Sequence, residues 1–298
     1  MIERLIGTLG GHGLVGERTI KLLQEDGIGV LSPSSSEVDV TNKNSVEKFV
    51  SNFDGDVILL LAAWTDVEGA EKNPEKARRV NVDGTRNVAE ASKNHNKLLV
   101  FISTDFVFEG TKESPGPYNE NAQIASIDSK NIGEYARSKV MAEKILNEVG
   151  GKFAIVRISY PFGNPDSPKD FVNRTISYIE KGYKLFDDQL FTPTYIPDLV
   201  KAIEVISKNK LTGVFHVASH SVTNPYEFGV YVAQKTGKDP DLIGKGSLRE
   251  FLKDSSRTKK PVWGGLDPFN SERILGLKFK SWKEAVDQQL EKREPALS

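Results

Sequence analysis

The sequence contains no cysteine and only four histidines among its 298 residues. Without thiols the chain cannot form disulfides, use a thiolate nucleophile or build a zinc site on cysteine. The histidines are His12, His95, His216 and His220, and none forms a metal-ligand spacing with a second histidine or an acid within a credible helix or strand. We therefore expect no metal site, and we expect structural or incidental roles for these four residues.

Long apolar runs and a net charge are also absent. No run approaches the roughly 18 to 20 apolar residues that span a bilayer. The 40 basic and 41 acidic residues nearly cancel, which argues against a protein that binds nucleic acid or an anionic membrane. The chain enters a predicted strand at residues 5–9 without a visible cleavable signal, so the expected location is cytoplasmic.

The first 160 residues alternate between short apolar runs and amphipathic stretches. We predict strands at residues 5–9, 57–63, 98–103 and 153–158, and helices at residues 16–26, 74–92 and 132–149. Continuously apolar strands separated by helices are typical of parallel sheets that are covered on both faces. The pattern predicts an α/β fold with a Rossmann-type, doubly wound parallel sheet.

A glycine motif joins the first predicted strand to the first predicted helix. Gly10, Gly13 and Gly16 follow the spacing Gly-x-x-Gly-x-x-Gly, with Leu14 and Val15 between the last two. Glycine permits a tight turn and lets the backbone approach a pyrophosphate. The following helix directs unpaired N–H groups at that anion. Because the motif stands between a strand and a helix, it indicates a dinucleotide cofactor.

The end of the second strand bears on which dinucleotide is bound. NAD enzymes often place an acid here to bind the ribose 2′-hydroxyl, whereas this chain has Ser34 and Ser35. Serine hydroxyls can donate to a 2′-phosphate, and Arg18 is a further candidate phosphate partner. We therefore favour NADP(H) over NAD(H). Glu37 could reverse this preference, and the serines could equally form a simple turn.

A tyrosine and a lysine with catalytic spacing lie in the helix predicted at 132–149. Tyr135 and Lys139 are four residues apart and share one helix face. A neighbouring ammonium favours the phenolate, so we expect Lys139 and a bound oxidised nicotinamide to lower the Tyr135 pKa from about 10 towards about 7. Ser103 and Thr104 end a buried strand, where ligands bind in open α/β sheets. One of them is expected to hydrogen-bond a substrate carbonyl oxygen.

Together with other stretches, these motifs resemble extended short-chain dehydrogenases/reductases, and among them the dTDP-4-dehydrorhamnose reductase family. The most specific stretch is 102–110, Ile-Ser-Thr-Asp-Phe-Val-Phe-Glu-Gly. The others are residues 10–16, 37–41, 62–67, 80–82, 135–139, 188–189, 192–195 and 214–218.

The resemblance implies that NADPH reduces C4 of a nucleotide-linked 4-keto-6-deoxy sugar. It implies the catalytic residues Thr104, Tyr135 and Lys139. Cofactor contacts are expected from Gly10, Gly13, Leu14, Val15, Gly16, Ser34, Ser35, Asp39, Val40, Ala62, Ala63, Thr65, Asn81, Tyr135 and Lys139. Substrate contacts are expected from Thr65, Val67, Thr104, Asp105, Phe106, Tyr160, Gln189 and Thr194. Dimers are common in the superfamily, so a homodimer is a further expectation.

These roles suggest how the chain is divided. We expect residues 1–160 to form the NAD(P)-binding Rossmann domain, with a returning segment near residues 190–218. Residues 161–298 are expected to form a smaller, partly interwoven substrate-binding lobe, with helices at 171–181, 196–208 and 225–236 and a strand at 213–217. The charged helical tail at 284–294 is expected on the surface.

Some positions depart from the family pattern and leave the identity of the substrate open. Phe191 stands where glycine is common, and Tyr160 where tryptophan is common. Glu134 precedes the catalytic tyrosine, where an apolar residue is usual.

Two alternatives to reduction remain. One is a sugar-nucleotide epimerase or 4,6-dehydratase, but dehydratases carry Asp-Glu after the threonine, and Asp105-Phe106 lacks one of these acids. The other is a non-catalytic NADP-binding regulatory subunit, because the beta subunit of methionine adenosyltransferase resembles the same reductases.

Overall fold

A single parallel sheet organises the fold. The computed structural model describes residues 5–254 and 256–291. Six strands pair in the order β2-β1-β3-β4-β5-β7. Their bounds are Leu5–Leu9 (β1), Gly29–Leu31 (β2), Val57–Leu60 (β3), Leu98–Thr104 (β4), Lys152–Ile158 (β5) and Gly213–His216 (β7). The predicted doubly wound, Rossmann-type sheet is confirmed.

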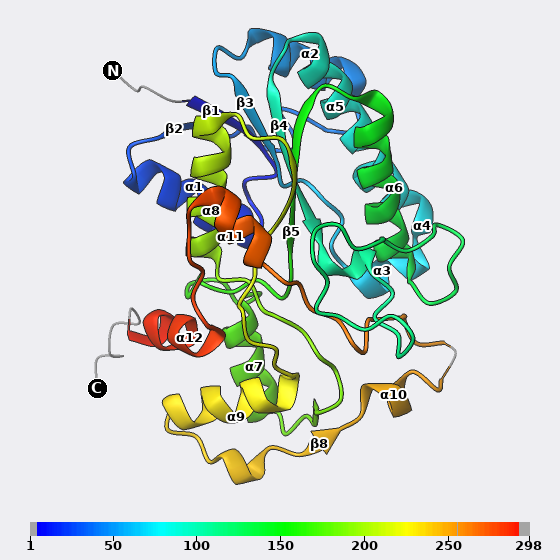
Figure 1. The fold of residues 1–298 in the computed structure, drawn as a ribbon, viewed down its shortest axis with the longest axis vertical. Coiled ribbons are helices and arrows are strands. Elements are labelled where there is room, and N and C mark those ends of the chain that lie inside the picture. Colours follow the sequence, from blue (N-terminus) through cyan, green and yellow to red (C-terminus); the bar gives the residue numbers. More distant parts are fainter. Residues whose placement is uncertain (1–4, 255, 292–298) are drawn as a thin grey trace.

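Helices cover both faces of this sheet (Figure 1). Apolar side chains of α1 (Leu14–Glu25), α8 (Ile196–Asn209) and α11 (Phe269–Leu275) pack on one face. Those of α2 (Lys43–Asn52), α5 (Gly84–Asn94) and α6 (Glu134–Val149) pack on the other. Since both faces are buried, the strands read as continuous apolar runs. Helix α8 and strand β7 thus extend the sheet layer with residues from the second half of the chain.

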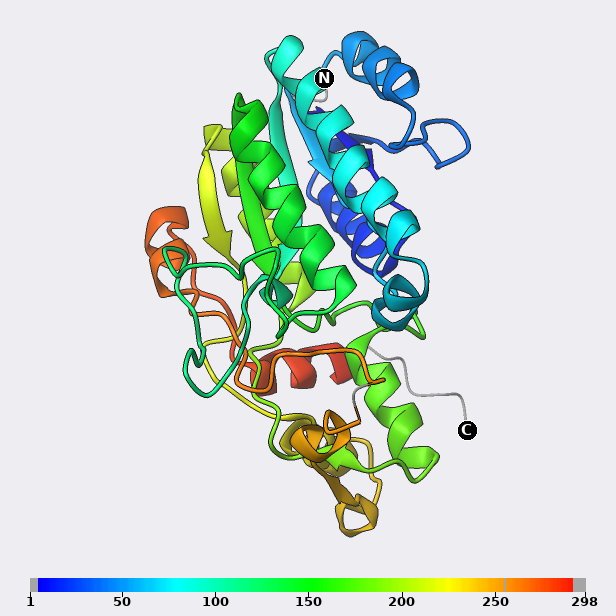
Figure 2. The ribbon, with the colours of Figure 1, turned by 90° about the vertical axis from the view of Figure 1, so that its right-hand side faces the viewer.

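A lower lobe lies beyond the carboxyl ends of the strands (Figure 1). It is built from α7 (Phe171–Glu180), α9 (Pro225–Lys235), α10 (Leu248–Phe251) and α12 (Trp282–Glu291), with a small two-stranded sheet of β6 (Leu185–Phe186) and β8 (Lys245–Gly246). Figure 2 shows α12 lying between the main sheet and the other helices of this lobe. An aromatic core that includes Phe162, Phe191, Phe228 and Trp282 joins these elements.

The C-terminal helix corrects one expectation. The segment 284–294 was predicted to be a surface tail, but Ala285 and Val286 of α12 are fully buried in the aromatic core. Trp282, before the predicted segment, anchors the same helix. In the sequence these apolar residues alternate with charged ones, so the apolar face of the helix does not appear as a continuous apolar run. Residues 292–294 lie outside the described residues.

The predicted helix at 74–92 is divided in the structure. The chain forms α3 (Val67–Lys72), α4 (Pro74–Arg78), a π-helical turn at Arg79–Asp83, and then α5. Strand β3 also ends earlier than predicted, because the N–H groups of Leu61 and Ala62 both bond the Leu9 carbonyl. The main chain turns out of the sheet at this point, where α/β sheets form their ligand sites.

Within residues 5–254 and 256–291, no helix combines the length and the apolar character that crossing a membrane requires.

Candidate active site

The predicted site residues gather at the carboxyl edge of the sheet, which faces the lower lobe (Figure 1). Gly10 follows β1, Ala62 and Ala63 follow β3, and Thr104 ends β4. Helix α6 carries Tyr135 in its first turn. Four connections far apart in the sequence therefore meet where open parallel sheets bind ligands.

The three glycines of the motif differ in whether, and why, the fold requires glycine at their positions. Gly10 has a φ of +92°, and a Cβ on it would lie 2.2 Å from the Ala62 nitrogen. A Cβ on Gly16 would lie 2.6 Å from the Gly10 carbonyl oxygen, so both positions require glycine for packing. Gly13 caps α1 with an ordinary φ of −95°, and a Cβ there would meet nothing within 4 Å. The space at Gly13 is open to a ligand.

This arrangement fits a dinucleotide. Leu14 and Val15 lie in the first turn of α1. Gly13, which precedes this turn, has no side chain that could cap the N–H groups of the turn. Such a helix start attracts the negative charge of a pyrophosphate. The buried hydroxyl of Ser32 has no hydrogen-bond partner among residues 5–254 and 256–291, and it lies against Gly11 of the glycine loop. A polar ligand at this loop would provide hydrogen-bond partners for the N–H groups at the start of α1 and for the Ser32 hydroxyl.

The contrast between the two glycines gives a first prediction. Gly13→Ala should leave the free energy of unfolding within about 0.5 kcal/mol of wild type, because the new Cβ meets no protein atom. It should weaken NADPH binding at least about tenfold, because the methyl group holds the pyrophosphate away from the backbone. Urea unfolding and fluorescence titration with NADPH measure the two effects.

Gly10→Ala is the matched control. Its Cβ would collide with the backbone of Ala62 at a strained φ, so it should lose about 2 kcal/mol or more of stability. Wild-type NADPH affinity in Gly13→Ala would show that the pyrophosphate does not lie on this loop.

The segment after β2 carries the residues predicted to select the cofactor. The Glu37 carboxylate accepts hydrogen bonds from the backbone N–H of Ser34, at 2.7 Å, and from its hydroxyl, at 2.8 Å. These bonds, with a smaller contribution from His12, hold the pKa of Glu37 below its usual value. Ser35 is exposed beside them. A 2′-phosphate at this place would compete with Glu37 for the donors of Ser34.

Neighbouring residues limit what else can touch the adenosine half. Asp39 is exposed, and its carboxylate accepts from the N–H and the hydroxyl of Thr41, both at 2.9 Å. Val40 is buried in the sheet core. Burial raises the pKa of the Tyr195 phenol at the start of α8, and Arg18, predicted as a phosphate partner, lies close enough to oppose this rise.

Asn81 fixes the loop that follows β3. Its amide bonds the N–H and the carbonyl of Trp64, at 2.7 and 3.1 Å, and donates to the Ser138 hydroxyl at 2.8 Å. The side chain is 1% exposed, so it acts as a support between this loop and α6. It thereby places Thr65, which is exposed, and Val67, which is half-buried, at the rim of the site.

Thr104 and Tyr135 meet at the centre of the site. The Thr104 side chain lies close enough to the Tyr135 phenol to favour the ionised form of that phenol, against the larger effect of burial. Its ring meets Phe106 edge-on, with centroids 6.0 Å apart. The hydroxyls of a β4 residue and an α6 residue are therefore adjacent, which is the arrangement needed for two donors to share one substrate oxygen.

Lys139 lies on the same helix but does not lower the pKa of Tyr135 as expected. Burial and nearby Asp105 raise that pKa well above its usual value, against the effect of Thr104. The Lys139 amine donates to the Ile102 carbonyl at 2.8 Å and lies 3.9 Å from the centre of the Phe101 ring. Burial lowers its own pKa to about 7. In the protein without cofactor, burial therefore decides the Tyr135 pKa, and the lowering expected from Lys139 together with an oxidised nicotinamide stays a prediction.

Asp105 is a second ionisable group at the centre. It is 3% exposed. Its carboxylate accepts from the Thr104 hydroxyl at 3.2 Å and from the Ser159 hydroxyl at 2.7 Å. Burial nevertheless raises the pKa of Asp105 to about 6. The sequence indicated this residue as a substrate contact, but not its bond to Thr104.

Comparison with known proteins agrees with this geometry. Residues 4–294 match the RmlD substrate binding domain. The chain belongs to this family. It is 30% identical over 282 residues to a probable low-salt glycan biosynthesis reductase, Agl14, of Haloferax volcanii, covering 90% of this chain and 91% of that protein. It is 31% identical over 290 residues to a dTDP-4-dehydrorhamnose reductase of Mycolicibacterium smegmatis, covering 96% and 84%.

A solved structure is similar over nearly the whole chain. It is a dTDP-4-dehydrorhamnose reductase from Bacillus anthracis in complex with NADP, with a TM-score of 0.85, 26% identity and coverage of 97% of this chain and 99% of that one. The resemblance inferred from sequence motifs is thereby confirmed.

In this RmlD family member, two departures from the pattern form one unit. The Tyr160 ring stacks on Phe191, with centroids 4.3 Å apart, and its hydroxyl accepts from the Gln189 amide at 2.6 Å. Tyr160 also has a φ of +42°, which is unusual for a residue other than glycine. Phe191 is 1% exposed and fills the space beneath Tyr160. The side chains of Tyr160 and Phe191 therefore shape this side of the site together.

Thr194 does not reach the surface of the site. It is fully buried, and its hydroxyl bonds the Val217 carbonyl and accepts from the Ser159 N–H at 2.9 Å. The predicted direct contact with substrate is corrected, because both of these bonds are to backbone groups. Thr194 instead holds the backbone on which Ser159 and Tyr160 lie.

A buried ion pair lies behind the catalytic helix and was not predicted. Arg157 binds Glu143 through two hydrogen bonds, at 3.0 and 2.7 Å, and Ser103 donates to the same carboxylate at 2.5 Å. The Arg157 guanidinium also lies 3.2 Å from the His216 ring nitrogen. Burial and Arg157 lower the pKa of His216 to about 3, so this histidine stays neutral, as a structural residue does.

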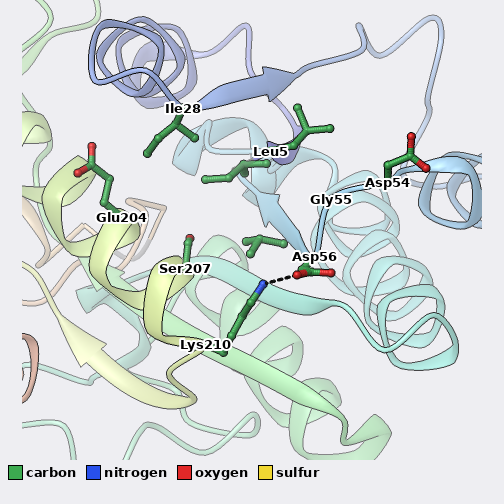
Figure 3. Close-up of a pocket in the computed structure, with 10 residues that line it drawn as sticks. Leu5, Ile28, Asp54, Gly55, Asp56, Glu204, Ser207 and Lys210 are labelled. Carbon is green, nitrogen blue, oxygen red and sulfur yellow. Dashed lines mark hydrogen bonds and ion pairs between the residues drawn. The ribbon is translucent and has the colours of Figure 1, made fainter. Parts of the chain in front are cut away.

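A cavity of about 340 Å³ opens at the opposite, amino edge of the sheet (Figure 3). Its lining includes Ile28, Asp54 and Ser207, and Lys210 pairs there with Asp56 at 3.0 Å. None of the predicted catalytic or binding residues lines it.

Proposed function

We propose that the protein reduces the 4-keto group of a nucleotide-linked 4-keto-6-deoxy sugar with hydride from NADPH. The adjacent hydroxyls of Thr104 and Tyr135, at the sheet edge that also carries the glycine loop, are the observation that supports this function best. The similar proteins described above, including the reductase bound to NADP, support the same function.

The chemistry of these residues suits reduction. Bound NADPH supplies the hydride. Tyr135 donates a proton to the oxygen that becomes an alkoxide, and its raised pKa keeps the phenol protonated until that strong base forms. Thr104 orients the oxygen, and Lys139 holds the cofactor ribose through its amine.

We assign the remaining residues by their place around this centre. On the cofactor side these are Gly10, Gly13, Leu14, Val15, Gly16, Ser34, Ser35, Asp39, Ala62 and Ala63, with Val40 and Asn81 as supports. On the sugar side they are Thr65, Val67, Asp105, Phe106, Tyr160 and Gln189. A cytoplasmic location and a homodimer stay predictions.

The test is an assay of the purified protein with NADPH and dTDP-4-keto-6-deoxyhexose. Loss of NADPH absorbance with formation of a 6-deoxyhexose nucleotide supports the proposal. No oxidation with any nucleotide-linked keto sugar, together with tight binding to another protein, would instead support the regulatory-subunit alternative.

We also propose that NADPH is preferred over NADH, and Glu37 supplies the test. Glu37→Gln removes the negative charge that occupies the donors of Ser34. It should therefore tighten NADPH binding by about two- to fivefold, as expected for an exposed charge pair, and leave NADH binding nearly unchanged. Titration calorimetry with both cofactors measures the difference. Unchanged NADPH affinity would place the 2′-phosphate elsewhere.

A further inference from the structure

The Thr104 hydroxyl can donate only one hydrogen bond, so its partners in the protein determine whether it can donate to a substrate. A threonine hydroxyl has one proton to donate and two lone pairs that accept. The Phe106 N–H occupies one lone pair, at 3.2 Å. The hydroxyl proton itself is donated to Asp105, at 3.2 Å. In this arrangement Thr104 has no proton left for a substrate oxygen.

Protonation of Asp105 reverses the direction of these bonds. A protonated carboxyl donates to Thr104 and fills the second lone pair, so the threonine proton turns towards the site. An ionised carboxylate has the opposite effect, because it is the strongest acceptor present and holds the threonine proton.

We propose that Asp105 is a positioning residue whose protonation makes Thr104 present its proton to the carbonyl oxygen of the substrate, beside the proton of Tyr135. This inference rests on the proposed reduction and adds to it the condition under which the donor pair forms. The ionised form leaves the site with one donor fewer.

The surroundings of Asp105 favour the neutral form. The titratable groups whose pKa values respond to its charge, within the described residues, are the phenols of Tyr118, Tyr135 and Tyr160. They come from the loop before α6, from α6 and from the segment after β5, and each is neutral near pH 7. Hydrogen bonds from Ser159, Thr104 and two backbone N–H groups favour ionisation, but burial outweighs them and places the pKa of Asp105 at about 6. Closure of a ligand over the site removes more water and raises this pKa further.

Two variants separate this role from a structural one. Asp105→Asn keeps the shape, can donate permanently to Thr104 through its amide and can accept from Ser159 through its oxygen. Ser159→Ala removes a hydrogen bond that favours the ionised carboxylate, so it should raise the Asp105 pKa. Both changes are small enough for the buried site to keep its packing.

The experiment compares pH profiles of kcat/KM for wild type and both variants. In wild type, kcat/KM should fall about tenfold per pH unit above the Asp105 pKa, since the protonated form is the competent one. This limb should vanish in Asp105→Asn and move to higher pH in Ser159→Ala. Any limb that arises from Lys139 should stay at the same pH in all three proteins. An unchanged limb in Asp105→Asn would overturn the proposal.

A second readout does not depend on turnover. With 13C-labelled tyrosine, the Tyr135 ring signal of the cofactor-free protein, assigned with Tyr135→Phe, should shift as Asp105 titrates near pH 6. It should not shift in Asp105→Asn. If no keto sugar is reduced, the proposed function fails, whereas the inference fails only if this titration is absent.

Discussion

Replacing Tyr135 by phenylalanine is expected to lower kcat about a thousandfold while NADPH affinity stays within about tenfold of wild type. A positioned general acid contributes roughly 10² to 10⁴ in rate. The ring itself is retained, so its edge-on contact with Phe106 should hold the helix in place. Steady-state kinetics and cofactor titration of the same preparation measure the two effects.

Tyr183→Phe is the matched control for this change. Tyr183 is 55% exposed, and its hydroxyl takes no part in the proposed chemistry, so kinetics should stay at wild-type level. If Tyr135→Phe instead loses NADPH binding with little effect on the rate at saturation, Tyr135 is a packing residue and the reaction needs another acid. The two outcomes cannot be confused, because one lies in kcat and the other in the dissociation constant.

The parts of the fold that the sequence predicted are those with local causes. Strands β1, β4 and β5 read as apolar runs because the sheet is buried on both faces. Gly10 and Gly16 were recognisable because the turn between β1 and α1 leaves no room for a Cβ. The spacing of Tyr135 and Lys139 placed them on one helix, and the buried end of β4 indicated Thr104.

The parts that the sequence could not predict depend on long-range contacts. The π-helical turn that divides the predicted helix at 74–92 contains Asn81, whose amide reaches Trp64 and Ser138. Thr194 looked like a site residue because its backbone borders the site, whereas its hydroxyl is turned to Val217.

The direction of the Tyr135 pKa shift depends on burial, which spacing does not reveal. Four residues along a helix bring an amine near a phenol, but the amine of Lys139 turns to Ile102 and the Phe101 ring. The carboxylate of Glu143 raises the pKa of Lys139, but this carboxylate is already bonded to Arg157 and Ser103. Burial of the charged Lys139 amine therefore destabilises the fold, because within the described residues no carboxylate is paired with this amine alone. This destabilisation can be measured.

Lys139→Met should raise stability and remove activity. Burial lowers the pKa of Lys139 to about 7 in the folded protein, against about 10.4 in the unfolded chain. Between these values the unfolded chain binds a proton that the folded chain does not, so stability rises with pH across this window and the penalty is largest below pH 7. A methionine of similar length has no charge to desolvate, and we expect a gain of about 2 kcal/mol at pH 6.5 after the lost bond to Ile102 is included.

The same substitution should lower kcat/KM by about a hundredfold or more, because the amine that holds the ribose is gone. Urea unfolding at pH 6.5 and again above pH 10 tests the origin of the stability gain, which should nearly disappear at the higher pH. Lys144→Met is the matched control, because Lys144 is exposed on the same helix. It should change stability by less than about 0.5 kcal/mol at either pH. A Lys139→Met protein that is destabilised at pH 6.5 would show that the amine supports the fold, and the cost assigned to its burial would then be wrong.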